Sequence, residues 1–169
     1  KSLGKNINVV EMRGNINTRL KKLKNSNIDG IILAKAGLRR MEMDSLITQN
    51  LSVESFVPSP GQGVLCIECL SQHSEIMSKI KKIVHLNTEI CVSAERIFAA
   101  QMDGDCMSPI GAHATIQKDL ISITGFVATA DGARYIRNKI EGNKNNYKDL
   151  STKLSNLFIK MGSKGMLGC

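Results

Sequence analysis

Cys106 is the residue whose surroundings most clearly suggest chemistry. It lies in the stretch MDGDCMSPIG (102–111), between the end of a helical pattern and Pro109, which restrains the backbone. A thiolate is a good nucleophile toward soft carbon electrophiles. The neighbouring Asp103 and Asp105 disfavour a further negative charge on the thiol, which suits one permanent alkylation better than repeated turnover. An incidental surface cysteine is the competing interpretation.

A group of arginines forms the second chemical feature. Arg13 follows a strand pattern, Arg19 comes six residues later, and Arg39 and Arg40 follow AGL at the expected start of a helix. Open α/β sheets place ligands at strand ends and helix starts. A guanidinium group binds a carboxylate through two parallel hydrogen bonds, which lysine cannot copy. The pattern indicates a site for a carboxylate ligand, with ordinary surface charge pairing as the alternative for each arginine.

The motif CIEC at Cys66 to Cys69 resembles half of a zinc or redox site. The sequence has no second CxxC motif, and GVLCIECL reads as a strand, on which positions i and i+3 point to opposite faces. The three histidines show no metal spacing either. We therefore predict no metal site and keep a thiol-redox or zinc protein as a minor alternative.

The net charge of +8 predicts an acidic partner. Nucleic acid is the usual first candidate, but aromatic residues make up only 4 % and tryptophan is absent, so a base-stacking platform is not expected. A non-catalytic basic module that binds RNA stays open as an alternative. The sequence has no apolar run of about 18 residues, so we expect no membrane span. Five cysteines without secretory marks indicate free thiols in a reducing compartment.

The N-terminal part alternates between strand and helix patterns. Strands are expected at 8–12 and 29–34, a helix within 13–25 capped by Asn17 or Thr18, and a second helix at 36–47. This order predicts a parallel α/β layer of the kind seen in periplasmic-binding-protein-like domains. The proline- and glycine-rich PSPGQG (58–63) reads as a linker or hinge.

The C-terminal part predicts a small α+β domain. A strand (63–70) and an amphipathic helix (74–84) come first, followed by a helix at 89–102 capped by Asn87 or Thr88. Residues 113–142 read as a meander with a hairpin at Asp131-Gly132, and 145–162 as a closing helix. We expect a roughly three-stranded antiparallel sheet with helices. The fold class is thus α/β: a partial α/β domain followed by this α+β domain.

Four ordered blocks carry a resemblance to a known family. RGNINTRLKKL, DGIILAKAGLRRM, PSPGQGVLCIEC and SAERIFAAQMDGDCMSPIGAHA resemble successive motifs of porphobilinogen deaminase, or hydroxymethylbilane synthase. The blocks span about residues 9–115, and the remainder fits that family's third domain more loosely. The resemblance implies a transferase that joins four porphobilinogen molecules into hydroxymethylbilane with release of ammonia, in haem and tetrapyrrole biosynthesis.

The resemblance also implies roles for individual residues. The family holds a dipyrromethane cofactor, made from its own substrate, through a thioether to one loop cysteine, which matches Cys106. Its carboxylate-binding arginines match Arg13, Arg19 and Arg40, and Gln62 matches the hinge near the cleft. Where the family has two glycines before the cysteine, this sequence has Gly104 and Asp105.

The resemblance implies a domain plan in which the family's first domain, with its catalytic aspartate, precedes the residues present here. Residues 1–57 then belong to the second domain, 58–85 form the hinge and a strand–helix segment of the first domain, and 86–169 form the cofactor-bearing domain. We therefore expect an incomplete, inactive fragment whose partners are porphobilinogen and the N-terminal part of the enzyme. A monomer in the cytoplasm or a plastid is expected, with no nucleic-acid partner.

Overall fold

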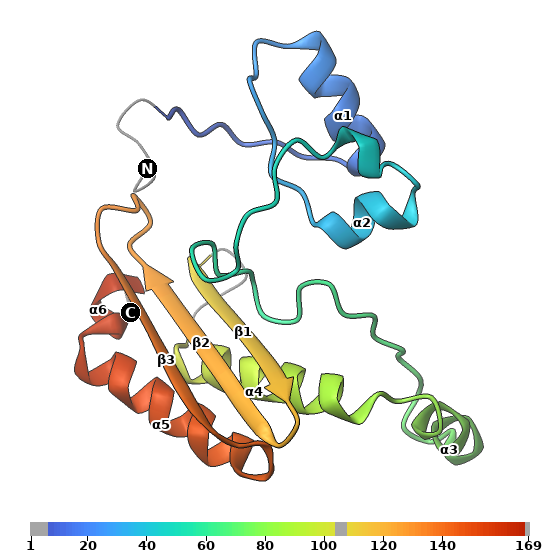
Figure 1. Ribbon diagram of the computed structural model, residues 1–169, viewed down its shortest axis with the longest axis vertical. Helices are drawn as coiled ribbons and strands as arrows, with labels where there is room; N and C mark the ends of the chain where they lie inside the picture. Colours follow the sequence, from blue (N-terminus) through green and yellow to red (C-terminus); the bar gives the residue numbers. More distant parts are fainter. Residues whose placement is uncertain (1–6, 104–107, 168–169) are drawn as a thin grey trace. The chain divides into compact units, whose positions relative to one another are not determined.

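The structure is a computed structural model that describes residues 7–103 and 108–167. The chain divides into two compact units, Lys1–Leu51 and Ser52–Cys169, which we describe separately. The ribbon in Figure 1 follows the chain from blue at the N-terminus to red at the C-terminus. Most of the buried apolar side chains belong to the second unit.

The first unit contains helix α1 (Ile16–Asn25), which begins at Asn15. The Asn15 side chain accepts hydrogen bonds from the Thr18 backbone N–H and hydroxyl group, both at 2.9 Å. This satisfies one of the N–H groups that have no partner in the first helical turn. Our expectation of a cap at Asn17 or Thr18 was therefore wrong by two or three residues.

Helix α2 (Lys35–Arg40) and the short 3₁₀ helix η1 (Asp44–Leu46) replace the single helix expected at 36–47. The interruption falls at Glu42, whose φ of 56° is incompatible with a continuing right-handed helix. Arg39 and Arg40 consequently end α2, whereas we expected them to open a helix. A helix C-terminus carries partial negative charge, which favours two cations there.

The strands expected at 8–12, 29–34 and 63–70 do not form in the described structure. Apolar residues that a sheet would bury are instead exposed, by 69 % at Val9, 63 % at Ile32 and 76 % at Leu65. A strand is stable only when a neighbouring strand pairs with its backbone, and none of these segments has such a neighbour here. The expected parallel sheet is thus wrong for the described residues, whose fold is a mixture of helices with one antiparallel sheet.

The second unit contains that sheet, which in the described residues has three antiparallel strands in the order β1-β2-β3. The strands are β1 (Ile110–Gln117), β2 (Leu120–Ala128) and β3 (Tyr135–Asn143). The turn between β2 and β3 contains Gly132 at a φ of 69°, beside Asp131, whose carboxylate accepts a hydrogen bond from Thr129. The meander and the Asp131-Gly132 hairpin are therefore confirmed.

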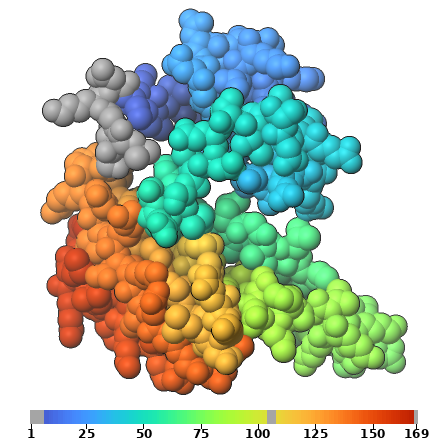
Figure 2. Space-filling view, in the orientation of Figure 1, coloured from blue at the N-terminus to red at the C-terminus, as the bar shows by residue number. Residues whose placement is uncertain are grey.

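Helices cover one face of this sheet. Helix α4 (Leu86–Gln101) and helix α5 (Tyr147–Lys160) lie behind the strands in Figure 1, and α6 (Ser163–Leu167) follows α5. The 3₁₀ helix η2 (Lys144–Asn146) leads into α5, and α3 (Ser74–Lys81) precedes α4. The opposite face of the sheet is open to the viewer in Figure 2, in yellow and orange.

Helix α4 starts three residues before the expected range. Its first turn is closed by a 2.7 Å hydrogen bond between the His85 ring and the Thr88 hydroxyl. The expected caps at Asn87 and Thr88 were therefore wrong, although Thr88 takes part in closing the first turn.

The core of the second unit lies between the sheet and α4 and α5. Phe98 of α4 and Phe158 of α5 are fully buried, with ring centroids 4.9 Å apart in an edge-to-face arrangement. Gly125 of β2 gives these rings their space, since a Cβ atom there would lie 2.5 Å from Phe98 Cζ. This close packing holds α4 at a fixed position on the sheet.

Candidate functional site

Arg13 and Arg19 come together at the start of α1. The Arg13 guanidinium pairs with Glu11 at 2.8 Å, and Arg19 Nε donates a hydrogen bond to the Gly14 carbonyl oxygen at 2.7 Å. Lys22 Nζ donates to the Arg13 carbonyl oxygen at 3.1 Å. Three cationic side chains therefore surround the turn before α1, where the N-terminal end of the helix adds further positive potential.

Arg40 lies on the neighbouring helix. Helix α2 approaches α1 at Gly37, where a Cβ atom would lie only 2.7 Å from Ile16 Cδ1. Arg40 is exposed at the end of α2, and the preceding Arg39 pairs with Asp44 at 3.5 Å. Arg13 just before α1, Arg19 on α1 and Arg40 on α2 therefore all belong to the first unit, in which the two helices contact each other.

Gln62 lies in the second unit, within a double turn. The Gln62 N–H donates to the Ser59 carbonyl oxygen at 3.1 Å, and Gly61 between them has a φ of 73°. Pro60 followed by a glycine at positive φ is the sequence pattern of a type II turn. Gly63, with a φ of 81°, repeats the pattern in the next turn, which the Val64 N–H closes on the Gly61 carbonyl oxygen. The Gln62 side chain is exposed between these turns.

Glu95 of α4 is a site residue that the sequence analysis missed. The residue is only 5 % exposed, and its carboxylate accepts hydrogen bonds from the Gly61 N–H at 2.7 Å and the Ala114 N–H at 2.8 Å. His113 Nδ1 lies 3.8 Å from the same carboxylate. The sequence offered one signal for this residue: an acidic side chain within the buried face of the helix, next to Ala94 and one turn before Phe98.

Cys106 lies outside the described residues, within 104–107. The residue before this gap, Asp103, pairs with Lys164 of α6 at 2.7 Å. The cysteines within the described ranges, Cys66, Cys69 and Cys91, carry free thiols. Burial, and then the nearby Glu95 carboxylate, raise the pKa of the Cys91 thiol, which makes it a poor nucleophile.

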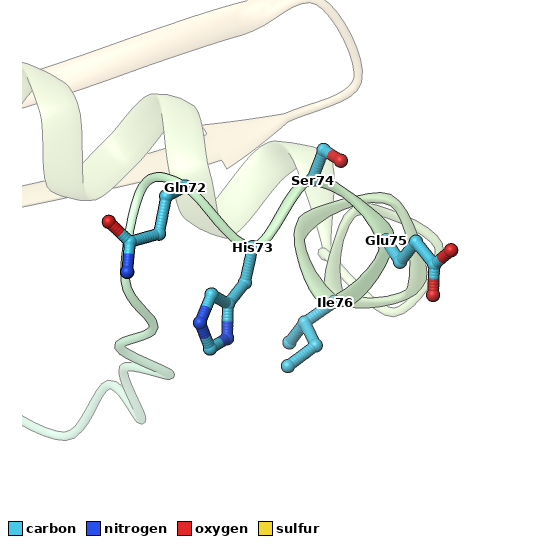
Figure 3. Close-up of a pocket in the computed structure, with 5 residues that line it drawn as sticks. All are labelled: Gln72, His73, Ser74, Glu75 and Ile76. Carbon is cyan, nitrogen blue, oxygen red and sulfur yellow. The ribbon is translucent and has the colours of Figure 1, made fainter.

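The described residues contain no group of three or more His, Cys, Asp or Glu side chains that could hold a metal ion. A surface hollow at the start of α3 is lined by Gln72, His73, Ser74, Glu75 and Ile76. Figure 3 shows these side chains spreading outward in different directions, so they do not form one converging site. Over the same ranges, no helix is long and apolar enough to cross a membrane.

Two family models match the chain in succession. Residues 1–78 match the model described as porphobilinogen deaminase, dipyromethane cofactor binding domain, and residues 89–160 match the model of its C-terminal domain. The chain belongs to the porphobilinogen deaminase family. Arg13, Arg19, Arg40 and Gln62 fall in the first match, whereas Glu95 and position 106 fall in the second. The resemblance drawn from the four sequence blocks is confirmed.

Curated porphobilinogen deaminases resemble the chain over nearly its whole length. The protein of Clostridium botulinum (strain Kyoto / Type A2) is 40 % identical over 160 residues, which cover 95 % of this chain and 54 % of the relative. The protein of Pelotomaculum thermopropionicum is 37 % identical over 95 % of this chain and 52 % of its own length. The protein of Campylobacter hominis is 39 % identical, with 95 % and 53 % coverage. The chain spans about half the length of the curated relatives it matches, toward their C-terminal end.

Proposed function

We propose that this chain is the cofactor-carrying portion of a porphobilinogen deaminase, which makes hydroxymethylbilane from four porphobilinogen molecules and releases ammonia. The observation that supports this most strongly is the ordered match to both family models. In this proposal Cys106 forms the thioether that holds the dipyrromethane. When bound, the dipyrromethane supplies the pyrrole end to which further pyrrole units are added.

The arginines fit a ligand of this chemistry. Each pyrrole unit carries an acetate and a propionate group, so the bound chain is a polyanion. Arg13 and Arg19 offer planar guanidinium groups beside the N-terminal end of α1, and Arg40 offers one on the adjoining helix. Guanidinium groups bind carboxylates through paired hydrogen bonds and keep their charge at any physiological pH. We assign all three to holding the cofactor and the growing chain.

The remaining domain assignments are part of the same proposal. Residues 1–57 would belong to the second domain of the enzyme, 58–85 to the hinge and a returning strand–helix segment, and 86–169 to the C-terminal domain. Apolar residues in the extended segment after the hinge are exposed, by 76 % at Leu65, 56 % at Ile67 and 61 % at Leu70. The N-terminal portion of the enzyme would cover them by pairing this segment into its sheet. We propose a monomer that works in the cytoplasm or a plastid.

Substitution of Arg40 by lysine tests the assignment of the arginines. Arg40→Lys keeps the positive charge but loses the paired geometry, so we expect kcat/KM for porphobilinogen to fall about tenfold. The chain would be joined to the N-terminal portion of the Clostridium botulinum relative, and ammonia release would be measured.

Arg39→Lys is the matched control, because Arg39 lies on the same helix end and pairs with Asp44. We expect the control to keep its activity within about twofold, since exposed ion pairs contribute little. Equal losses in the two variants would contradict a specific role for Arg40.

A further inference from the structure

The PSPGQG turn (58–63) is held against the rest of the second unit by several contacts. Pro58 accepts a hydrogen bond from the Ala112 N–H at 2.9 Å, on the outer edge of β1. The backbone approaches so closely that a Cβ atom at Gly111 would lie 2.8 Å from the Val57 carbonyl oxygen. Three residues after Pro58, the Gly61 N–H donates a hydrogen bond to the buried Glu95 carboxylate at 2.7 Å.

The Glu95 carboxylate connects three elements that are far apart in the sequence. One oxygen accepts from Ala114 on the edge of β1, and the other accepts from Gly61 in the turn, while Glu95 itself belongs to α4. A buried carboxylate forms short, strong hydrogen bonds, and leaving either N–H group without an acceptor is costly. Helix α4 is in turn fixed by Phe98, which packs fully buried one turn after Glu95.

We infer that Glu95 is a positioning residue. It holds the PSPGQG turn against α4 and β1 and thereby fixes the position of Gln62. Gln62 follows directly after the hydrogen-bonded Gly61, and its own N–H closes the turn on Ser59. Freeing Gly61 would therefore loosen both turns that flank Gln62. We call the hydrogen bonding of Gly61 and Ala114 to the Glu95 carboxylate the clamp. The clamp does not depend on the proposed function, whereas its consequence for Gln62 rests on that function.

Hydrogen exchange on the whole chain tests the clamp. In Glu95→Gln the side chain keeps its size, but one of its two acceptor oxygens becomes an NH₂ donor. Because Ala114 is held in β1, we expect the remaining oxygen to stay with Ala114 and Gly61 to lose its acceptor. The Gly61 amide should then exchange about tenfold faster than in the parent chain.

Ile123→Val is the matched control, since Ile123 is fully buried in β2 as part of the hydrophobic core. Ile123→Val should raise the rate of hydrogen exchange throughout the second unit, without a selective increase at the Gly61 amide. The clamp would be contradicted if the Gly61 amide exchanged at an unchanged rate in Glu95→Gln. It would also be contradicted if the exchange rate rose equally in both variants, compared at equal stability. Glu95→Asp, which keeps the charge on a shorter side chain, gives the same test if Glu95→Gln does not fold.

A double-mutant cycle tests whether Glu95 acts through Gln62. In the enzyme completed with the relative's N-terminal portion, Glu95→Gln should lower kcat/KM several-fold when Gln62 is present and have little further effect on Gln62→Ala. Additive losses would show that Glu95 supports the fold only and would overturn the positioning role. Hydrogen exchange needs no turnover, so it decides the clamp even if the proposed function is wrong.

Discussion

The isolated chain is expected to release no ammonia from porphobilinogen above the uncatalysed background. Mixing it with the N-terminal portion of the Clostridium botulinum relative is expected to raise the rate by about 100- to 10,000-fold, the usual contribution of a positioned acid–base group. The physical reason is that the cationic pyrrole formed when ammonia leaves needs a nearby carboxylate. The family resemblance assigns that carboxylate to the portion of the enzyme before these residues.

Two controls make this result specific. The same N-terminal portion assayed alone should be inactive, because the proposed attachment point of the cofactor, Cys106, lies in the present chain. A chain carrying Cys106→Ala should also fail to restore activity, because it lacks the thiol that we propose holds the cofactor. Ammonia release by the isolated chain at the rate of the complete enzyme would contradict the assignment of the catalytic carboxylate.

Phe98→Ala is expected to have the largest effect on stability. Phe98 is fully buried, its ring meets Phe158 edge to face, and it packs in the space left by the missing side chain of Gly125. Truncation of such a ring typically costs about 3–5 kcal/mol. A domain of this size has roughly 5–15 kcal/mol of stability in total, so the substitution should remove a large share of the stability of the second unit. Urea unfolding followed by circular dichroism measures the loss.

Leu157→Ala is the matched control for this prediction. Leu157 precedes Phe158 on α5 but is 39 % exposed, so its removal leaves no buried cavity. We expect it to cost no more than about 1 kcal/mol. If the two variants lowered the free energy of unfolding equally, the Phe98–Phe158 contact would not be the centre of the core.

The structure of residues 86–169 was predicted from the sequence much better than that of the residues before them, for a physical reason. The strands of the 113–142 region pair with their neighbours along the chain, so alternation and an Asp-Gly turn are enough to define them. The strands expected at 8–12, 29–34 and 63–70 would need partners that are distant along the chain. Without those partners, β propensity alone does not make a strand, and residues such as Val9 and Leu65 stay exposed.

The candidate site was only partly accessible from the sequence. Arg13, Arg19 and Arg40 stood out because of their residue type and because the family motifs contain them. The hydrogen bond between Glu95 and Gly61 joins residues 34 positions apart, and no local pattern predicts such a pair. The end of helix α2 after Arg40 likewise depends on the positive φ of Glu42, and glutamate is not a residue type that predicts a helix end.

The mass of this chain, produced together with the N-terminal portion of the Clostridium botulinum relative in cells that make haem, tests the central claim most directly. A thioether-linked dipyrromethane on Cys106 should add roughly 420 Da, the size of two pyrrole units after loss of their ammonia. The extra mass should map to the peptide that contains Cys106 and should be absent from Cys106→Ala. The same extra mass on any other side chain, or its survival in Cys106→Ala, would contradict the account.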